Sequence, residues 1–403
     1  MSEENKSEVI ENVAVFNQAK KANEEPVSEE MVEQEEVKEA QAEENQTVNH
    51  TPSRVTPENY LSSGVTLLNL TTTNDPDCFV EKGTYDLFVG TSGSGKSFLA
   101  MQLLAEAANN SAFDGYELVY DDAENGALFD VPQMFGNKLA QRLRAPRYGD
   151  DGLPDYSATV EDFFFNVDDL QKEKKPFIYI LDSMDSLTSS PADVKFDENK
   201  ATRRADLEKG KDTSVLTQGY GDGKAKLISG FLRRIVNRLP ETGSILIIIS
   251  QVRENISGYG PKYVRSGGQA LRFFAHEEYW FDNVRNLVKT VDKKDRQYGQ
   301  VTRVEIKKNR ITGIKSPIEF PILLGTGISD YDACLDWLCN EGKIIKPARS
   351  NGLYDYPALN LKLNRDAMIE RMEDDFEPFK QDMKETWFSI LKAITPKRKR
   401  KYE

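Results

Sequence analysis

The segment from Gly90 to Ser97 constrains the fold more than any other part of this 403-residue sequence. It follows the apolar run 85–89, precedes a stretch of helical periodicity at 98–108, and matches G-x4-G-K-S in full. Such glycines let backbone N–H groups wrap phosphates, the lysine reaches the outer phosphate oxygens, and the last hydroxyl faces Mg²⁺. We therefore predict an ATP and Mg²⁺ site formed by Gly90, Thr91, Ser92, Gly93, Ser94, Gly95, Lys96 and Ser97.

Four short apolar runs, separated by helix-like stretches such as 98–108 and 226–238, define the expected fold class. Continuous apolar runs suit strands that are buried on both faces, which is typical of a parallel sheet covered by helices. We predict an α/β fold of this kind, with strands at 85–89, 117–120, 177–181 and 245–249. The alternating runs 302–306 and 318–324 predict antiparallel strands that extend the sheet, and the segments 331–341 and 365–394 predict helices.

Acidic side chains close two of the predicted strands. Ligands bind at the carboxyl ends of parallel strands, so we predict that Asp182, after the run 177–181, lies beside the Mg²⁺ together with Ser97. Hydrolysis also requires a group that orients or deprotonates water. Glu124 is well placed after the strand 117–120, but Asp121 and Asp122 compete for that role on spacing alone.

The charge of the chain is unevenly distributed. The net charge of −13 argues at first against a polyanionic partner such as nucleic acid. Residues 1–50, however, hold fourteen Glu and four Lys, so this segment carries −10 and leaves only −3 for the other 353 residues. Such a composition cannot bury enough apolar surface to offset its ordering entropy, so we expect a disordered acidic tail. The acidic total therefore does not exclude nucleic acid.

The scarcity of cysteine and histidine excludes other classes of protein. Three Cys and two His, one of them His276, argue against a disulfide scaffold and against a metal site built from several His and Cys ligands. We expect His276 to be packed or at a strand start, and Cys334 and Cys339 to be core thiols. No apolar run is long enough for a bilayer span. We expect a soluble, cytoplasmic protein in a reducing compartment, without a membrane partner.

The order of these motifs resembles the RecA-type DNA recombinase family, which comprises bacterial RecA and phage UvsX-like strand-exchange ATPases. The resemblance covers about residues 60–330. It rests on the phosphate loop followed by Asp122-Ala123-Glu124, Asp182-Ser183, Ser250-Gln251-Val252-Arg253, the segment 266–275 and the segment 307–311. It implies a RecA-like P-loop NTPase core over 56–328, preceded by the disordered tail 1–55 and followed by a small, mainly helical C-terminal region with a basic end over 329–403.

The resemblance also implies roles for individual residues. Glu124 becomes the group that activates water, and Gln251 becomes the sensor of the γ-phosphate. Lys308 and Arg310 correspond to the basic pair that reaches the ATP of a neighbouring subunit. Their i, i+2 spacing places both on one face of an extended segment.

The family binds DNA through two loops, which correspond here to about 189–222 and 253–268. The first is long and polar, and the second mixes basic residues with tyrosines, as neutralisation of phosphates and contact with bases would need. The candidate DNA-binding residues are Arg203, Arg204, Arg253, Lys262 and Arg265. The implied partners are single-stranded DNA, homologous duplex DNA, further copies of the chain in a filament or ring, and single-strand-binding or mediator proteins.

The predicted function is ATP-dependent DNA recombination and repair, with homologous pairing, strand exchange and DNA-stimulated ATP hydrolysis. Two alternatives remain at this stage: a hexameric RecA-fold helicase or motor, and an ATP-binding mediator that exchanges no strands. The sequence departs from the family pattern because the acidic tail stands where an N-terminal docking element is expected. Within it, the segment 16–19 has the F-x-x-A form of a polymerisation plug found in relatives. The basic run 397–401 could aid DNA loading.

Overall fold

A computed structural model describes residues 55–126, 129–189, 222–254, 263–265, 268–349 and 352–398. The predicted acidic tail up to residue 54, with its segment 16–19, lies outside the described residues, as does the end of the basic run, 399–401. The described residues from Val55 to Ile390 belong to one compact unit. The predicted domain boundaries at residues 55 and 328 stay a prediction.

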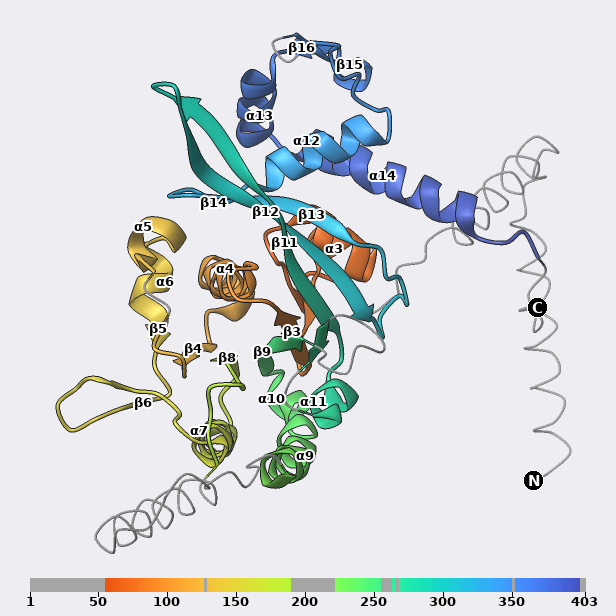
Figure 1. Cartoon of the computed structure of the whole chain (residues 1–403). Coiled ribbons are helices and arrows are strands. Elements are labelled where there is room, and N and C mark those ends of the chain that lie inside the picture. Colours follow the sequence, from red (N-terminus) through yellow and green to blue (C-terminus); the bar gives the residue numbers. More distant parts are fainter. Residues whose placement is uncertain are drawn as a thin grey trace, which may run out of the picture. The chain divides into compact units, whose positions relative to one another are not determined.

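A ten-stranded sheet dominates the described part of the chain (Figure 1). The strands β11, β3, β9, β8, β4 and β5 run parallel, and β12, β13 and β14 continue the sheet from β11 in antiparallel fashion. Their order is β14 (Gly327–Ile328), β13 (Ile318–Leu323), β12 (Lys294–Lys308), β11 (Glu278–Val291), β3 (Tyr85–Gly90), β9 (Ile245–Glu254), β8 (Phe177–Asp182), β4 (Glu117–Asp122) and β5 (Leu143–Arg144), with β10 (Tyr263–Arg265) paired to β9. The predicted α/β class and mostly parallel sheet are confirmed.

Helices cover both faces of the sheet, which explains why the strands are apolar throughout. On one face, α7 (Val160–Glu173), α9 (Asp222–Val236) and α11 (Gln269–Phe274) form one buried cluster with alternate residues of β3, β8 and β9. On the other, α4 (Lys96–Asn109) contacts the same three strands (Figure 1). Burial of side chains on both faces contributes about 25 cal/mol per Å2 of apolar area removed from water.

The sequence predicts only part of the hairpin formed by β11 and β12. The sequence predicts a strand at 302–306, whereas β12 is much longer and its partner β11 was not predicted at all. Asp292 and Lys293 connect the two strands with positive φ angles of 52° and 61°, as a two-residue hairpin turn requires. Only residues 278–281 of β11 pair with β3, so the hairpin extends beyond that strand (Figure 1).

The C-terminal segment is mainly helical, as predicted. Its elements are α12 (Asp330–Asn340), β15 (Tyr354–Tyr356), the short helix η2 (Pro357–Leu359), β16 (Leu361–Leu363), α13 (Arg365–Asp374) and α14 (Glu377–Ile394). The stretch predicted as one helix over 365–394 is therefore wrong in one respect, because it breaks after Asp374. Pro378 has no N–H to donate to the carbonyl four residues earlier, so it is tolerated only in the first turn of a new helix.

Buried acid groups attach this segment to the core. Asp330 accepts hydrogen bonds from the backbone N–H and the hydroxyl of Thr66, at 2.8 and 2.6 Å, at the start of α3 (Thr66–Thr73). Burial raises the pKa of Asp330 to about 6, and the hydrogen bonds from Thr66 oppose that shift. Glu106 on α4 has its pKa raised to about 7, first by burial and then by the charges of Asp330 and Asp77.

The remaining elements are short and connect the larger ones. They are β1 (Tyr60–Leu61), β2 (Val80–Glu81), η1 (Ser111–Phe113), α5 (Val131–Phe135), α6 (Asn137–Arg142), β6 (Arg147–Tyr148), β7 (Pro154–Asp155) and α10 (Leu239–Thr242). Among the described helices, none has both the length and the apolar character that a membrane span requires.

The raised pKa of Glu106 predicts a specific pH dependence of stability. The folded protein holds this proton more tightly than the unfolded chain, so the stabilisation is complete below about pH 4.5 and is lost as the pH rises through about 7. Glu106→Gln has no titrating group at this position. We therefore expect its free energy of unfolding to fall by about 2 kcal/mol less than that of the wild type between pH 5 and 7.5. Urea unfolding at both pH values measures this. Glu373→Gln, an exposed change on α13, should leave the slope unaltered, and an equal slope in the Glu106 variant would contradict the prediction.

Candidate functional site

The phosphate loop joins β3 to α4 with the geometry that its glycines permit. Gly95 has φ +96°, and a methyl group there would lie 2.7 Å from Ile322 Cδ1, so only glycine fits. Behind the loop, Gln300 Nε2 donates to the Gly93 carbonyl at 2.8 Å and the Thr302 hydroxyl donates to the Ser94 carbonyl at 3.1 Å. The strand β12 thus holds the loop from one side, and a cleft of about 270 Å3 lies between them.

Lys96 is the first residue of α4 and is only 6% exposed. Its ammonium group donates to the Thr91 carbonyl at 2.7 Å, which keeps it over the loop. Burial lowers the pKa of Lys96, and the charges of Asp182, Glu124 and Asp185 oppose this shift. The lysine predicted to bind phosphate therefore lies within the field of both predicted acidic residues.

Asp182 ends β8, directly opposite Asp122 at the end of β4. The Tyr120 hydroxyl donates to Asp182 Oδ2 at 2.6 Å. Burial raises the pKa of Asp182, whereas hydrogen bonds from Ser97 and Tyr120 lower it. The structure thus brings the predicted pair Ser97 and Asp182 together. A hydroxyl and a carboxylate beside a phosphate loop are the hard oxygen ligands that Mg²⁺ prefers, so these residues fit the ion.

Glu124 and Gln251 meet in this site although they are 127 residues apart. Gln251 Nε2 donates to Glu124 Oε1 at 2.7 Å, and the Ser183 hydroxyl donates to the same oxygen at 2.6 Å. The register of β3 and β9 pairs Gly90 with Gln251, which explains how Gln251 reaches the phosphate loop. Its own backbone N–H donates to Asp185 Oδ2 at 2.6 Å.

The two competing acidic residues have other partners. Asp121 is fully buried and accepts hydrogen bonds from the Ser157 N–H and hydroxyl and from the Tyr179 hydroxyl, at 2.9, 2.6 and 2.6 Å. Burial raises the pKa of Asp121, and these hydrogen bonds lower it. Asp122 Oδ1 accepts the Gly126 N–H at 3.1 Å and so caps the turn after β4. Glu124, in turn, contacts Gln251.

Lys308 and Arg310 lie together, but away from their own chain's phosphate loop. Lys308 Nζ donates to the carbonyls of Arg272, Phe273 and Ala275 at 2.8, 3.1 and 2.5 Å, and Arg310 donates to the Phe273 carbonyl at 3.2 Å. Both therefore cap the C-terminus of α11, where cations are favoured. Burial, followed by the charge of Arg310, lowers the pKa of Lys308 to about 8. Lys308 pairs with Glu278 at the start of β11, whereas Gly90 pairs with Phe281 further along that strand.

Comparison with known proteins identifies the relatives of the chain. The family described as RecA N-terminal domain matches residues 204–329. The Protein RecA of Nostoc punctiforme is 27% identical over 308 residues, which are 75% of this chain and 73% of that protein. The Protein RecA of Rippkaea orientalis is 27% identical over 290 residues, 72% of each chain, and that of Synechocystis is 26% identical over 324 residues, 78% of this chain and 79% of that protein.

The chain is similar to RecA proteins over about three quarters of its length. The resemblance inferred from the motifs is therefore confirmed. The roles of the individual residues stay predictions, because similarity to whole proteins does not test residues one by one.

The predicted DNA-binding residues of the chain are described only in part. Arg203, Arg204 and Lys262 lie outside the described residues. Arg253 and Arg265 lie in β9 and β10, where Arg253 pairs with Val264 and Arg265 with Val252, and their side chains are not described. The two ends of the second predicted loop are thus paired as antiparallel strands, immediately after Gln251.

Several residues of the site were not predicted. Asp185 accepts a hydrogen bond from the Gln251 backbone N–H, and the Ser183 hydroxyl donates to Glu124. The Tyr120 hydroxyl donates to Asp182. Gln300 and Thr302 donate to carbonyls of the phosphate loop. The i, i+2 spacing of Gln300 and Thr302 in a strand, which places both on one face, is a signal that could have identified them.

Removal of Asp121 should affect stability rather than the nucleotide site. Asp121→Ala leaves the Ser157 N–H and the Tyr179 hydroxyl buried without an acceptor, so we expect a loss of about 2–3 kcal/mol in the free energy of unfolding. Urea unfolding measures this loss, and binding of a fluorescent ATP analogue at a temperature where the variant is folded measures the site. We expect an affinity within about twofold of wild type. A stable variant that has lost nucleotide binding would contradict the structural role of Asp121.

Proposed function

We propose that this chain is an ATP-dependent DNA recombination and repair protein. It binds single-stranded DNA as an oligomer or filament, promotes homologous pairing and strand exchange with duplex DNA, and hydrolyses ATP to ADP and phosphate faster when DNA is bound. The observation that carries the proposal is the contact of Gln251 with Glu124, since it joins the predicted water-activating group to the strand that leads into the second DNA loop.

Hydrolysis needs groups that bind the phosphates, a pair of ligands for one metal ion, and an activated water. In the proposed mechanism the loop and Lys96 bind the phosphates of ATP. Ser97 and Asp182 would hold a Mg²⁺ ion, which would neutralise phosphate charge. The Glu124 carboxylate accepts a proton from the attacking water or orients it, so that ADP and inorganic phosphate leave. The charges of Asp182 and Glu124 both act on Lys96 and oppose the lowering of its pKa by burial, which supports its place in this site.

Coupling to DNA follows from what Gln251 can contact. Its amide bonds Glu124 here, and its backbone is held by Asp185. An amide that turned toward the γ-phosphate would leave Glu124 and shift the end of β9, from which the second DNA loop begins. Two arrangements of one side chain could therefore bias both the site and the loop.

Assembly would bring Lys308 and Arg310 to ATP on a neighbouring subunit. Their position at the C-terminus of α11, away from their own phosphate loop, is compatible with a head-to-tail contact between copies. We further propose that the chain works inside the cell with single-strand-binding or mediator proteins.

The ATPase activity tests the coupling. Lys96→Ala should abolish turnover, because the phosphates lose their cation. Gln251→Ala should bind ATP with an affinity within about twofold of wild type but lose the stimulation of hydrolysis by single-stranded DNA. Gln381→Ala, on α14, serves as the matched control and should keep the stimulation. Equal rates of the wild type with and without single-stranded DNA would refute the proposal.

Electron microscopy distinguishes the forms of assembly. With single-stranded DNA and a non-hydrolysable ATP analogue, the wild type should form filaments. Arg310→Ala should form few or none because the contact between subunits loses its cation, whereas Arg371→Ala on α13 should assemble normally. Rings that unwind duplex DNA would favour the helicase instead. ATP and DNA binding with neither assembly nor joint molecules would favour the mediator.

A further inference from the structure

A second cluster of ionisable side chains lies at the amino edge of the sheet. Asp86 is the second residue of β3, and His276 and Glu277 directly precede β11. Backbone hydrogen bonds fix their positions, since His276 N donates to the Tyr85 carbonyl at 2.6 Å and Leu87 N donates to the Glu277 carbonyl at 3.1 Å. The phosphate loop follows the opposite end of β3, so this cluster is separate from the nucleotide site.

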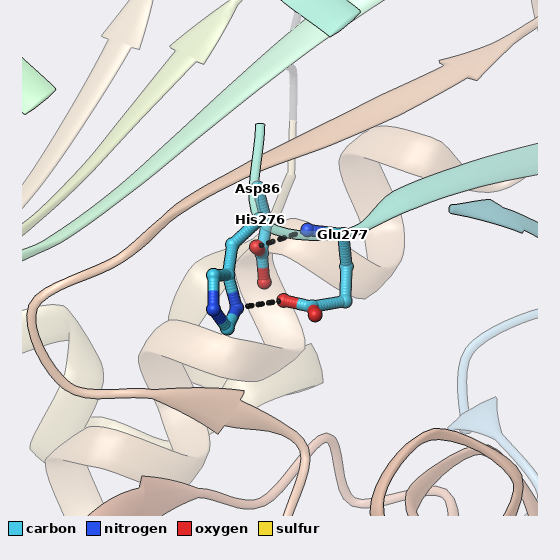
Figure 2. Close-up of side chains that lie close together, drawn as sticks. All are labelled: Asp86, His276 and Glu277. Carbon is cyan, nitrogen blue, oxygen red and sulfur yellow. Dashed lines mark hydrogen bonds and ion pairs between the residues drawn. The ribbon is translucent and has the colours of Figure 1, made fainter. Parts of the chain in front are cut away.

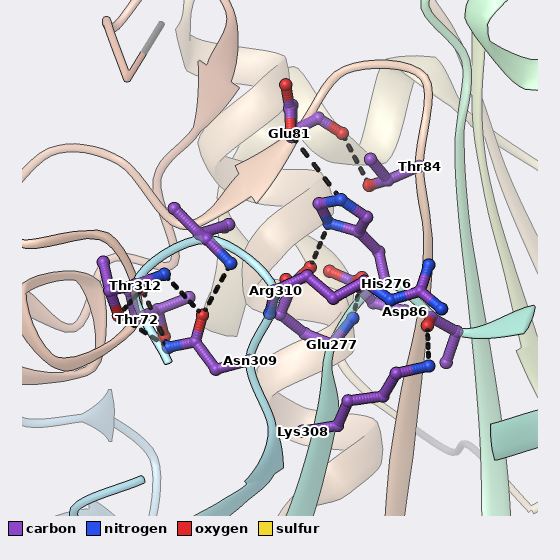
Figure 3. Close-up of polar contacts among 12 residues, drawn as sticks. Thr72, Glu81, Thr84, Asp86, His276, Glu277, Lys308, Asn309, Arg310 and Thr312 are labelled. Carbon is purple, nitrogen blue, oxygen red and sulfur yellow. Dashed lines mark hydrogen bonds and ion pairs between the residues drawn. The ribbon is translucent and has the colours of Figure 1, made fainter. Parts of the chain in front are cut away.

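The three side chains point toward one another (Figure 2). His276 Nδ1 lies 2.7 Å from Glu277 Oε2, and one ligand atom from each of the three residues lies within 4.8 Å of the others. Glu81 Oε2 lies 3.9 Å from His276 Nε2, on the outer side of the ring (Figure 3). Glu277 therefore faces Nδ1 of the imidazole with Asp86 close by, and Glu81 faces Nε2 on the other side of the ring.

The two central carboxyl groups are buried without enough donors. Asp86 and Glu277 are both 0% exposed. Asp86 Oδ1 accepts the Glu277 N–H at 3.1 Å, and Glu277 Oε1 accepts the Arg310 N–H at 3.2 Å. Among the described residues no donor reaches Asp86 Oδ2, unless the two carboxyls share a proton.

Electrostatics shows what this arrangement lacks. Burial, followed by the charge of Glu277, raises the pKa of Asp86 well above its usual range. Burial also raises the pKa of Glu277 to about 7, and the charge of Glu81 adds to that shift while the charge of Arg310 opposes it. Two adjacent buried carboxylates can both ionise only beside a positive charge. His276 and Arg310 supply part of that charge, and a bound divalent cation would supply more.

We propose that Asp86, His276 and Glu277 form a binding site for a divalent transition-metal ion of the zinc type, with water as the fourth ligand. Glu81 faces the other ring nitrogen, where it would accept the Nε2–H and orient the imidazole. A nitrogen ligand combined with carboxylates suits Zn²⁺, whereas Mg²⁺ takes oxygen ligands only. Access is through the partly exposed side chains of His276 and Glu81, which are 20% and 18% exposed. The neighbouring His276 and Glu277 atoms need to separate only slightly, because ligands of a tetrahedral zinc lie about 3.3 Å apart.

The metal would have a structural role. It would join β3 and the start of β11 to the segment after β12, because the Glu277 carboxylate also accepts the Arg310 N–H. That segment carries Lys308 and Arg310, which bond the end of α11 (Figure 3). A cation there would stabilise this edge without touching the phosphate loop, so its binding can be measured independently of ATP hydrolysis.

Metal titration of the full-length chain tests this inference. After removal of metals with EDTA and dialysis, Zn²⁺ should bind with one ion per chain by calorimetry and raise the unfolding temperature. Co²⁺ should give weak visible absorption bands without the intense thiolate band of a cysteine site. His276→Ala should lower the Zn²⁺ affinity at least tenfold, whereas His50→Ala, which removes the other histidine, should not change it.

A second variant separates binding from folding. Glu81→Gln changes a partly exposed side chain and should weaken Zn²⁺ severalfold while leaving the metal-free unfolding temperature within a few degrees of wild type. The inference is overturned if wild type shows no saturable Zn²⁺ binding, which would mean that Asp86 and Glu277 share a proton instead. Binding of equal affinity in the wild type and in a folded His276→Ala variant, or a thiolate band with Co²⁺, would overturn it equally.

Discussion

The parallel pairing of β3, β9, β8 and β4 is the constraint on which the candidate site depends. Their registers bring Gly90 beside Gln251 and Asp122 beside Asp182, so residues from four distant parts of the sequence meet at one edge. The strands are buried on both faces, and a shift by one residue would move each side chain of a strand to the opposite face, where it would meet different helices. The packing of the core therefore enforces the alignment of the polar residues at the edge.

The hairpin of β11 and β12 connects the two ends of this arrangement. Near its middle, Gln300 and Thr302 of β12 hold the carbonyls of the phosphate loop. At its end, Lys308 caps α11. Because paired strands are stiff along their length, a displacement of the phosphate loop could be transmitted by β12 to the surface proposed to contact the next subunit.

The sequence predicted the buried strands and the phosphate loop because their signals are local. A continuous apolar run and G-x4-G-K-S do not depend on distant residues. The strand β11 was missed because most of its side chains beyond Phe281 are polar or exposed and its turn, Asp292-Lys293, lacks the glycine that usually marks a hairpin. The choice between Asp121 and Glu124 was open for a similar reason. It depends on Ser157, Tyr179 and Gln251, whose positions follow only from tertiary packing.

The hydrogen-bond partners of the buried carboxylates distinguish those with a structural role from those that can bind a ligand. Asp121 accepts hydrogen bonds from three neutral donors, which indicates a structural group. Asp182 faces Lys96, Tyr120 and Ser97, a mixture that can rearrange around phosphate and metal. The pair Asp86 and Glu277 has fewer donors than acceptor atoms and an imidazole alongside. A carboxylate whose oxygens already accept hydrogen bonds has little to gain from a ligand. A buried pair with an oxygen that accepts none gains more, and this difference is why a cation is expected at the amino edge of the sheet and not at Asp121.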